Sequence, residues 1–267
     1  MPQDPGKYRE MPLIKGSPFD LTELPRLPYP DVQVLALQYQ TDPDAVRALL
    51  PDCYRVAEKP LVTVVFSHNY GLGFIAGGGY RLAAVQVAAR FDGEHDHVEG
   101  DYILVMFENK TRPILGGREH LGVPKQFADI SPVKILPNGH LRCEASVWGH
   151  LLFGIDLPPL RKQNALVRLI ANRQINARPW LAYKYIAALD GPPDADYPTV
   201  TQNDSQLKQL WLGKTGKVYY GDPGREDVAY IRGVVDALKT LPVRRVEQAL
   251  RFRGSAVLRM DLSRRLR

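Results

Sequence analysis

One lysine stands in a setting that suits covalent chemistry on carbonyl compounds. Lys125 follows Pro124 inside a glycine-marked stretch, residues 116–126, and the apolar run 102–107 precedes that stretch. A neutral lysine amine can attack a ketone, and the resulting iminium withdraws electrons from the neighbouring bonds. Desolvation favours the neutral form of an amine that is almost fully protonated in water at pH 7. Lys125 is therefore a candidate imine-forming nucleophile, although a solvated turn is the commoner setting for a lysine.

Strand-like segments dominate the chain around this lysine. Runs rich in β-branched and aromatic residues are typical of strands. They cover residues 33–39, 61–66, 82–91, 102–108 and 141–148, and residues 245–262 predict one or two closing strands. Because the spacing of βαβ units is missing, the pattern indicates a mostly antiparallel sheet and argues against a dinucleotide-binding domain.

Three segments have helical features. Asp42 can cap a short helix that runs to Leu50 and is stopped by Pro51. Residues 165–174 form a second candidate, and apolar residues between 226 and 241 share one face of a third. The predicted fold class is α+β, mostly β with flanking helices, in a single domain over residues 1–267.

Composition places the chain among globular proteins. It has 267 residues, of which 45% are hydrophobic and 24% charged, enough to bury a substantial core. The polar, proline-rich start at residues 1–5 does not resemble a signal peptide, and Cys53 and Cys143 are too few for a disulfide scaffold. Both features indicate the cytoplasm. Residues 60–80 lack Lys, Arg, Asp and Glu, but their five glycines predict strand, turn and strand rather than a membrane span.

The formal charge of +6 does not by itself predict a nucleic-acid-binding protein. Basic residues are interleaved with acids along the chain, apart from a short cluster at residues 264–267. A positive rim would instead help to collect small anionic substrates. Residues 213–216 imitate a phosphate-binding loop without its earlier glycine. The His- and acid-rich residues 94–99 predict a solvated hairpin loop rather than a metal site, and no cofactor is implied.

The surroundings of Lys125 resemble those of the Schiff-base lysine in the acetoacetate decarboxylase superfamily. In that family a Gly-Arg-Glu triplet, four residues and a Pro-Lys pair follow one another, as Gly117, Arg118 and Glu119 precede Pro124 and Lys125 here. The resemblance implies a cone-shaped, largely antiparallel barrel with flanking helices, and a homo-oligomer built from dimers, with a tetramer as one form. Other residues match in family order over nearly the whole chain: Tyr39, Thr41, Asp42, 44–51, 71–73, Arg178, Pro179, Lys184, Asp190, Gly191, Trp211, Gly213 and 241–243.

The chain departs from the family's decarboxylases in two places. In those enzymes a second lysine directly follows the Schiff-base lysine, whereas Gln126 stands there in this chain. The decarboxylases also have pocket glutamates in the segment that corresponds to residues 61–90, and this chain has no Asp or Glu between Leu61 and Arg90. The resemblance implies that those glutamates act on the carboxylate that leaves as CO2. Their absence therefore argues against decarboxylation.

An imine-forming lysine also supports other chemistry on a small 2-oxo acid. The iminium of pyruvate gives an enamine, which can add to an aldehyde, and loss of water then yields a 2-oxo-3-enoic acid. The reverse reaction hydrates such an acid. Superfamily members without the decarboxylase glutamates are known for this aldolase-dehydratase activity, and this chain resembles them.

Five residues are candidates to assist the lysine, as catalytic or substrate-binding groups. Arg118 could bind the substrate carboxylate through two hydrogen bonds, and Gln126 could donate another. Tyr80 could contact the substrate and move a proton, and His120 has the intrinsic pKa for that task. Glu119 joins this set as the neighbour of Arg118. Each candidate also has a purely structural alternative. Arg118 and Glu119 could pair with each other and brace the turn, and Tyr80 could be an aromatic residue at the rim of the pocket. His120 could point outwards, and the alternation of side chains along a strand could turn Gln126 away from the pocket.

Three functions are therefore compatible with the sequence. The first is a lysine-dependent aldolase-dehydratase or hydratase that acts on a small-molecule oxo acid. The second is a β-keto acid decarboxylase with a rebuilt pocket, and the third is a non-catalytic barrel that encloses an apolar ligand. Release of CO2 separates the second function from the first, and the absence of a covalent imine separates the third from both.

Overall fold

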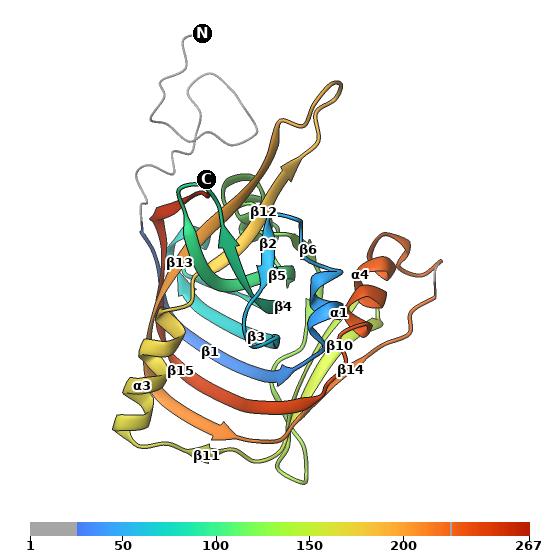
Figure 1. Ribbon diagram of the computed structural model, residues 1–267. Coiled ribbons are helices and arrows are strands. Elements are labelled where there is room, and N and C mark those ends of the chain that lie inside the picture. The colour runs from blue at the N-terminus through green and yellow to red at the C-terminus, as the bar shows by residue number, and fades with distance from the viewer. Residues whose placement is uncertain (1–25, 225) are drawn as a thin grey trace.

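The strands form a large sheet that closes on itself and a smaller sheet beside it (Figure 1). The computed structural model describes residues 26–224 and 226–267, so the proline-rich arm at residues 1–5 lies outside the described residues. The strands of the large sheet are β1 (Arg26–Gln40), β2 (Tyr54–Val56), β3 (Leu61–Leu72), β4 (Gly78–Asp92), β5 (His97–Glu108), β6 (Lys125–Phe127), β11 (Arg161–Lys162), β12 (Trp180–Ile186), β13 (Ala195–Gly213) and β15 (Arg245–Arg265).

The pairing of these strands makes a ring. The order is β2-β4-β3-β1-β15-β13-β12-β5-β6. Strands β4 and β5, each the second strand from one end, also pair with each other, and this pairing closes the ring. Neighbours are antiparallel except for β12 with β5 and β5 with β6, which are parallel. The smaller sheet is antiparallel, in the order β14-β10-β9-β7 with β8 beside β9. Its strands are β7 (Asp129–Ile130), β8 (Lys134–Ile135), β9 (Leu141–Val147), β10 (His150–Leu157) and β14 (Lys217–Tyr220).

Helices flank the sheets. Among the described residues they are α1 (Pro43–Arg47), α2 (Thr111–Gly116), α3 (Ala165–Asn176) and α4 (Ala229–Lys239), with a 3-10 turn (Gly73–Ile75) and a π-helical turn (Gly117–Leu121). Helix α3 lies along β13 on the outside of the large sheet (Figure 1), where two of its asparagines accept hydrogen bonds from the β13 backbone. Within the described part of the chain, no helix combines the length and apolarity needed to cross a membrane.

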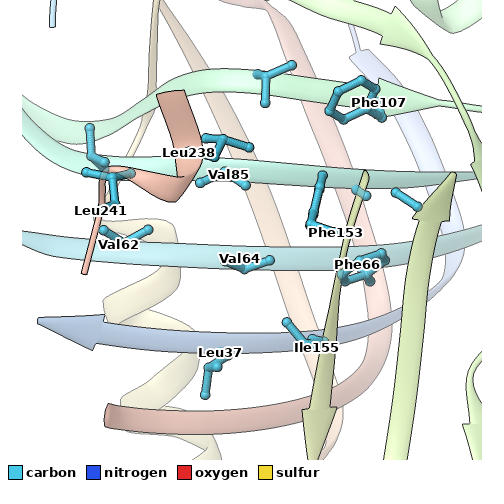
Figure 2. Packing of buried hydrophobic residues seen from close by; sticks show 14 of the residues in the cluster. Leu37, Val62, Val64, Phe66, Val85, Phe107, Phe153, Ile155, Leu238 and Leu241 are labelled. Atoms are coloured by element: carbon cyan, nitrogen blue, oxygen red, sulfur yellow. The ribbon is translucent and has the colours of Figure 1, made fainter. Parts of the chain in front are cut away.

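The main core lies between the closed sheet and the smaller sheet. The Phe66 ring from β3 and the Phe107 ring from β5 both pack on Phe153 from β10, with ring centroids 5.6 and 5.9 Å apart. Figure 2 shows these residues with Val62 and Val64 of β3 in the same apolar layer. Leu238 of α4 belongs to this cluster, so the last helix closes one end of the core. This packing fixes β5, the strand from which the site described below is built.

Most of the predicted elements are present near their expected bounds, and the predicted fold class is confirmed. The Asp42 carboxylate caps α1 by accepting a hydrogen bond from the Asp44 backbone N–H at 3.0 Å, although α1 ends at Arg47. Residues 245–265 form one strand rather than two. Several strands were not predicted, among them β10, β12 and the polar strand β13. The longest of these is β13. It exists because β12 and β15 satisfy its backbone on both edges, whatever its side chains prefer.

The stretch before Lys125 differs from the prediction. It was expected to be a turn marked by glycines, but residues 111–121 form α2 and the π-helical turn without a break. Gly116 and Gly117 both have helical backbone angles, and the left-handed residue that ends the segment is Gly122, with φ of 72°. The glycines lower helix propensity, which favours a turn from sequence alone. Packing around the lysine overrides that preference.

Candidate active site

Lys125 is placed by the connection from β5 to β6. The chain leaves β5 after Glu108, runs through α2 and the π-helical turn, and returns parallel to β5, with Lys125 opposite Met106. The Met106 backbone N–H donates to the Pro124 carbonyl at 3.1 Å and fixes this register. The Lys125 side chain is thereby folded back towards the end of β5, and only 7% of the residue is exposed.

The amine of Lys125 is held by two acceptors. Nζ donates to Glu108 Oε1 at 2.7 Å and to the Pro113 carbonyl at 3.0 Å. Glu108 is completely buried, and among the described residues its other oxygen, Oε2, has no hydrogen-bond partner. Buried polar atoms are rarely left unpaired, so this oxygen marks a position where a proton or a bound molecule can be accepted.

The electrostatics of this pair suit proton transfer. Burial raises the pKa of the Glu108 carboxyl above its ordinary value, and the neighbouring Lys125 ammonium opposes that rise. A buried ion pair pays a large desolvation cost, which falls when one proton passes from the ammonium to the carboxylate and both groups become neutral. The pair therefore combines a candidate nucleophile with a base in direct contact.

Gly117 makes room for the lysine. A Cβ atom at this position would lie 2.3 Å from Lys125 Cε and 2.7 Å from Nζ. At Gly122 the left-handed backbone is combined with close packing, since a Cβ there would lie 2.4 Å from the Cβ of Lys184. The glycines that mark this stretch in the sequence thus serve the packing of the lysine and of the turn that carries it.

A cavity of about 490 Å³, counting the space at its mouth, opens beside the lysine. One side is formed by α2 and the π-helical turn, and the other by β1, β15 and the 3-10 turn. No Asp or Glu is found among the described residues that line it. Those residues are Leu27, Tyr29, Phe74, Arg112, Pro113, Gly116, Gly117, His120, Leu121, Lys125, Leu258 and Met260.

Two of the candidates predicted from sequence lie at this cavity or directly behind it. His120 lines it and is half-buried. Tyr80 is buried behind it, with its hydroxyl 3.1 Å from that of Tyr29, which lines the cavity. Burial raises the pKa of both tyrosines, and the Glu108 charge adds to the rise in each. Both tyrosines are therefore neutral, and the contact between their hydroxyl groups links Tyr80 to the cavity through Tyr29.

The other candidates lie outside the cavity lining. Arg118 is exposed, and its guanidinium donates to the backbone carbonyl of Lys125 at 3.0 Å, so it braces the strand that carries the lysine. Glu119 and Gln126 are half-buried, and neither lines the cavity. Gln126 follows Lys125 on β6, where successive side chains point to opposite faces.

Sequence reasoning missed three residues of this site. Glu108 is the most important. The family resemblance implies pocket carboxylates within residues 61–90, whereas the site carboxylate comes from the end of β5. The available signal was an acidic residue that ends an apolar strand. Arg112 and Tyr29 carried no comparable signal, since their place at the cavity depends on the fold of α2 and on the pairing of β1.

Comparisons of sequence and of structure with known proteins both point to acetoacetate decarboxylases and their relatives. The family model for acetoacetate decarboxylase matches residues 10–265. The chain is 29% identical over 238 residues to acetoacetate decarboxylase 1 of Bradyrhizobium diazoefficiens, covering 85% of this chain and 82% of that relative. Among solved structures, acetoacetate decarboxylase from Legionella pneumophila has a TM-score of 0.72 at 21% identity, covering 90% of this chain and 87% of that one. The enduracididine biosynthesis enzyme MppR, complexed with the condensation product of pyruvate and imidazole 4-carboxaldehyde, has a TM-score of 0.67 at 16% identity, covering 90% and 88%.

Proposed function

The chain belongs to the acetoacetate decarboxylase family, and from this premise we propose that Lys125 forms an iminium with a small 2-oxo acid such as pyruvate. The proposed reaction is addition of the derived enamine to an aldehyde followed by loss of water, or the reverse hydration of a 2-oxo-3-enoic acid. The observation that carries the proposal is the buried contact of Lys125 with Glu108 at an open cavity.

Imine formation uses the pair directly. Glu108 takes one proton from the Lys125 ammonium, and the neutral amine adds to the keto carbon of pyruvate. Glu108 then returns the proton to the hydroxyl group of the carbinolamine, which leaves as water and generates the iminium. The raised pKa of Glu108 brings this carboxyl nearer to neutral pH, where a general acid–base group works best.

Carbon–carbon bond formation follows from the iminium. Glu108, ionised again, removes a proton from the methyl group, and the enamine attacks the aldehyde carbon to form a new C–C bond. The alkoxide is protonated from the cavity side, where His120 and Tyr29 lie. Loss of a second proton and of the hydroxyl group as water gives the conjugated iminium. Hydrolysis then releases the 2-oxo-3-enoic acid and restores Lys125, so that pyruvate and aldehyde give one enoic acid and one water.

The lining of the cavity favours this reaction over decarboxylation. A leaving carboxylate is helped by nearby acidic groups, but the described lining contains Arg112 and no acid. A cation at the cavity suits a carboxylate that stays on the product. The MppR structures with pyruvate and with its condensation product give the same chemistry a precedent on this fold.

A second candidate is decarboxylation of a β-keto acid. It is favoured by the name acetoacetate decarboxylase that relatives such as that of Bradyrhizobium diazoefficiens carry, and by a carboxylate in contact with the lysine. Acetoacetate should release CO2 rapidly if this candidate is correct, with no new conjugated-enone absorbance from pyruvate plus an aldehyde.

Borohydride trapping tests the shared first step. Reduction in the presence of pyruvate should add one adduct, mapped by peptide mass to Lys125, and the Lys125→Arg variant should give none. An exposed lysine changed in the same way, Lys59→Arg, is the matched control and should leave trapping intact. An adduct on another lysine, or no adduct at all, would remove the Schiff-base proposal and leave the non-catalytic barrel.

A further inference from the structure

We propose that the second reactant of this site is an aldehyde with an apolar body, and that Arg112 binds the carboxylate of the 2-oxo acid. The inference rests on the proposed function and adds the substrate class. It follows from the chemical difference between the two sides of the cavity.

The polar side of the cavity is lined by Arg112 and by Lys125, the proposed reacting residue. Arg112 lies in the first turn of α2 and lines the cavity, and the next residue is Pro113, whose carbonyl accepts a hydrogen bond from Lys125 Nζ at 3.0 Å. In a 2-oxo acid the carboxylate is bonded to the very carbon that the amine attacks. Its binding group must therefore lie within a few ångströms of that amine. Arg112 is the one arginine among the described residues that line the cavity, and a guanidinium can bind a carboxylate with two hydrogen bonds.

Arg118, the arginine expected from sequence, is less suited to this role. It is exposed, does not line the cavity, and donates to the backbone of Lys125. Recognition of the carboxylate is therefore assigned to Arg112 in the first turn of α2, six residues before Arg118 of the π-helical turn.

The opposite side of the cavity is apolar. Leu27 of β1 is paired in register with Leu258 of β15, and Met260 follows on the same strand. Phe74 from the 3-10 turn packs on Tyr29, with ring centroids 6.0 Å apart. These residues all belong to one apolar cluster of the protein. A charged or strongly hydrated aldehyde would lose its water here without gaining hydrogen-bond partners, whereas an alkyl or aryl group would be stabilised.

The open mouth of the cavity points the same way. The space of about 490 Å³ beside Lys125 includes open solvent, so a ligand longer than a three-carbon acid can extend outwards along the apolar side. Pyruvate bound at Lys125 and Arg112 would leave the apolar side empty. The space therefore suits the body of the aldehyde, either a chain of several carbons or an aromatic ring.

A series of aldehydes tests the apolar side. With saturating pyruvate, the conjugated-enone absorbance is followed for straight-chain aldehydes from acetaldehyde to octanal, for benzaldehyde, and for glycolaldehyde and glyoxylate. We expect kcat/KM to rise by about fourfold for each added methylene until the chain fills the cavity, with the two hydrophilic aldehydes slowest. Phe74→Ser should flatten the series, and borohydride trapping of pyruvate in the same variant reports whether it is folded.

Arg112→Met tests the polar side. The concentration of pyruvate needed for half-maximal trapping should rise about 10-fold to 100-fold, as expected for loss of a hydrogen-bonded charge. The concentration of acetone, a neutral ketone, needed for trapping should be unchanged. An equal loss for both ketones would overturn the role of Arg112.

The outcomes separate this inference from the proposed function. If pyruvate is trapped on Lys125 but glycolaldehyde or glyoxylate reacts as fast as the longest alkyl aldehyde, the apolar assignment is wrong and the Schiff-base enzyme stands. If pyruvate is not trapped in the native protein, the proposed function fails and the substrate class falls with it.

Discussion

Two buried pairs among the described residues place a possible nucleophile beside an ionisable partner, and they differ in almost every property that matters for catalysis. Lys125 and Glu108 are in contact at 2.7 Å, carry opposite charges when ionised, and adjoin a cavity. Cys143 and His68, on β9 and β3, lie 3.8 Å apart between Sγ and Nε2, and neither lines that cavity.

The protonation states separate the two pairs. Burial raises the pKa of the Cys143 thiol to about 11. Burial, helped by the charge of Arg81, lowers the pKa of His68 to about 4. Both groups are therefore neutral at pH 7, and a neutral thiol is a poor nucleophile. The thiol also donates to the Ser131 carbonyl at 3.2 Å, which satisfies it within the core.

Burial alone therefore does not make a site. It favours neutral forms in both pairs, but in the lysine–glutamate pair neutralisation is a proton transfer that produces a free amine. In the thiol–imidazole pair it removes the reactive thiolate. An adjacent cavity and an unpaired acceptor, Glu108 Oε2, complete the difference.

The largest expected effect is that of Lys125→Met. Turnover and borohydride trapping should both disappear, since the nucleophile is gone.

The Lys125→Met variant should also lose about 3–5 kcal/mol of unfolding free energy at pH 8, because a buried carboxylate is left without its partner. The loss should be smaller at pH 5, because burial raises the pKa of Glu108 and so favours its neutral form as the pH falls. Urea unfolding at both pH values measures it, and Lys125→Met combined with Glu108→Leu should recover most of the stability. A single variant as stable as the native protein would mean that Glu108 is not charged in the pair.

Glu108→Gln should have the next largest effect. The amide keeps the size and one acceptor oxygen but cannot take the proton, so turnover should fall by about 10²–10⁴-fold at neutral pH. Borohydride trapping of pyruvate should slow as well and recover towards alkaline pH, where solvent removes protons from amines. Turnover equal to that of the native protein would show that the base lies elsewhere, with His120 as the first candidate.

Gly117→Ala should displace the Lys125 amine and leave the fold intact. The new methyl group would overlap the end of the Lys125 side chain, which is flexible and can move aside. A displacement near 1 Å costs about 10²-fold in rate, while the helical backbone at Gly117 accepts alanine. Gly233→Ala in α4 is the matched control, because a Cβ there meets nothing within 4 Å. It should leave turnover unchanged and add about 0.5–1 kcal/mol of stability. Equal turnover in both variants would contradict the packing described for Lys125.

The smallest effect on turnover is expected at the second pair. Cys143→Ser and His68→Gln should leave the reaction unchanged, and a loss of activity in either variant would show that this pair takes part in the reaction. His68 should instead appear in the pH dependence of stability. Its pKa is about 4 in the folded protein and about 6.5 in the unfolded chain, so the unfolded chain binds the proton first as pH falls. Stability should therefore decline from pH 6.5 towards pH 4, by at most about 3 kcal/mol from this group. Urea unfolding should show a flatter decline for His68→Gln.

Local sequence features indicate the candidate nucleophile Lys125 and six of the longer strands. Lys125 is identified by short-range features, a proline before it and a glycine-marked segment at fixed spacing, and such features survive without knowledge of the fold. Strands such as β3 and β4 are similarly local, because β-branched and aromatic side chains in succession favour an extended backbone. The Asp42 cap and the start of α3 at Ala165 are local as well.

The groups that contact Lys125 depend on the tertiary structure. Glu108 contacts Lys125 because β5 and β6 pair in parallel with Met106 opposite the lysine, and that register is set by the α2 connection and the core beneath it. Arg112 reaches the cavity through the turn of α2, and Leu27 and Leu258 meet because the first and last strands of the described chain pair with each other. Arg118, the closest arginine to Lys125 in the sequence, is turned to the backbone instead. Contacts between residues far apart in the chain depend on how the whole sheet closes, and no local pattern records that closure.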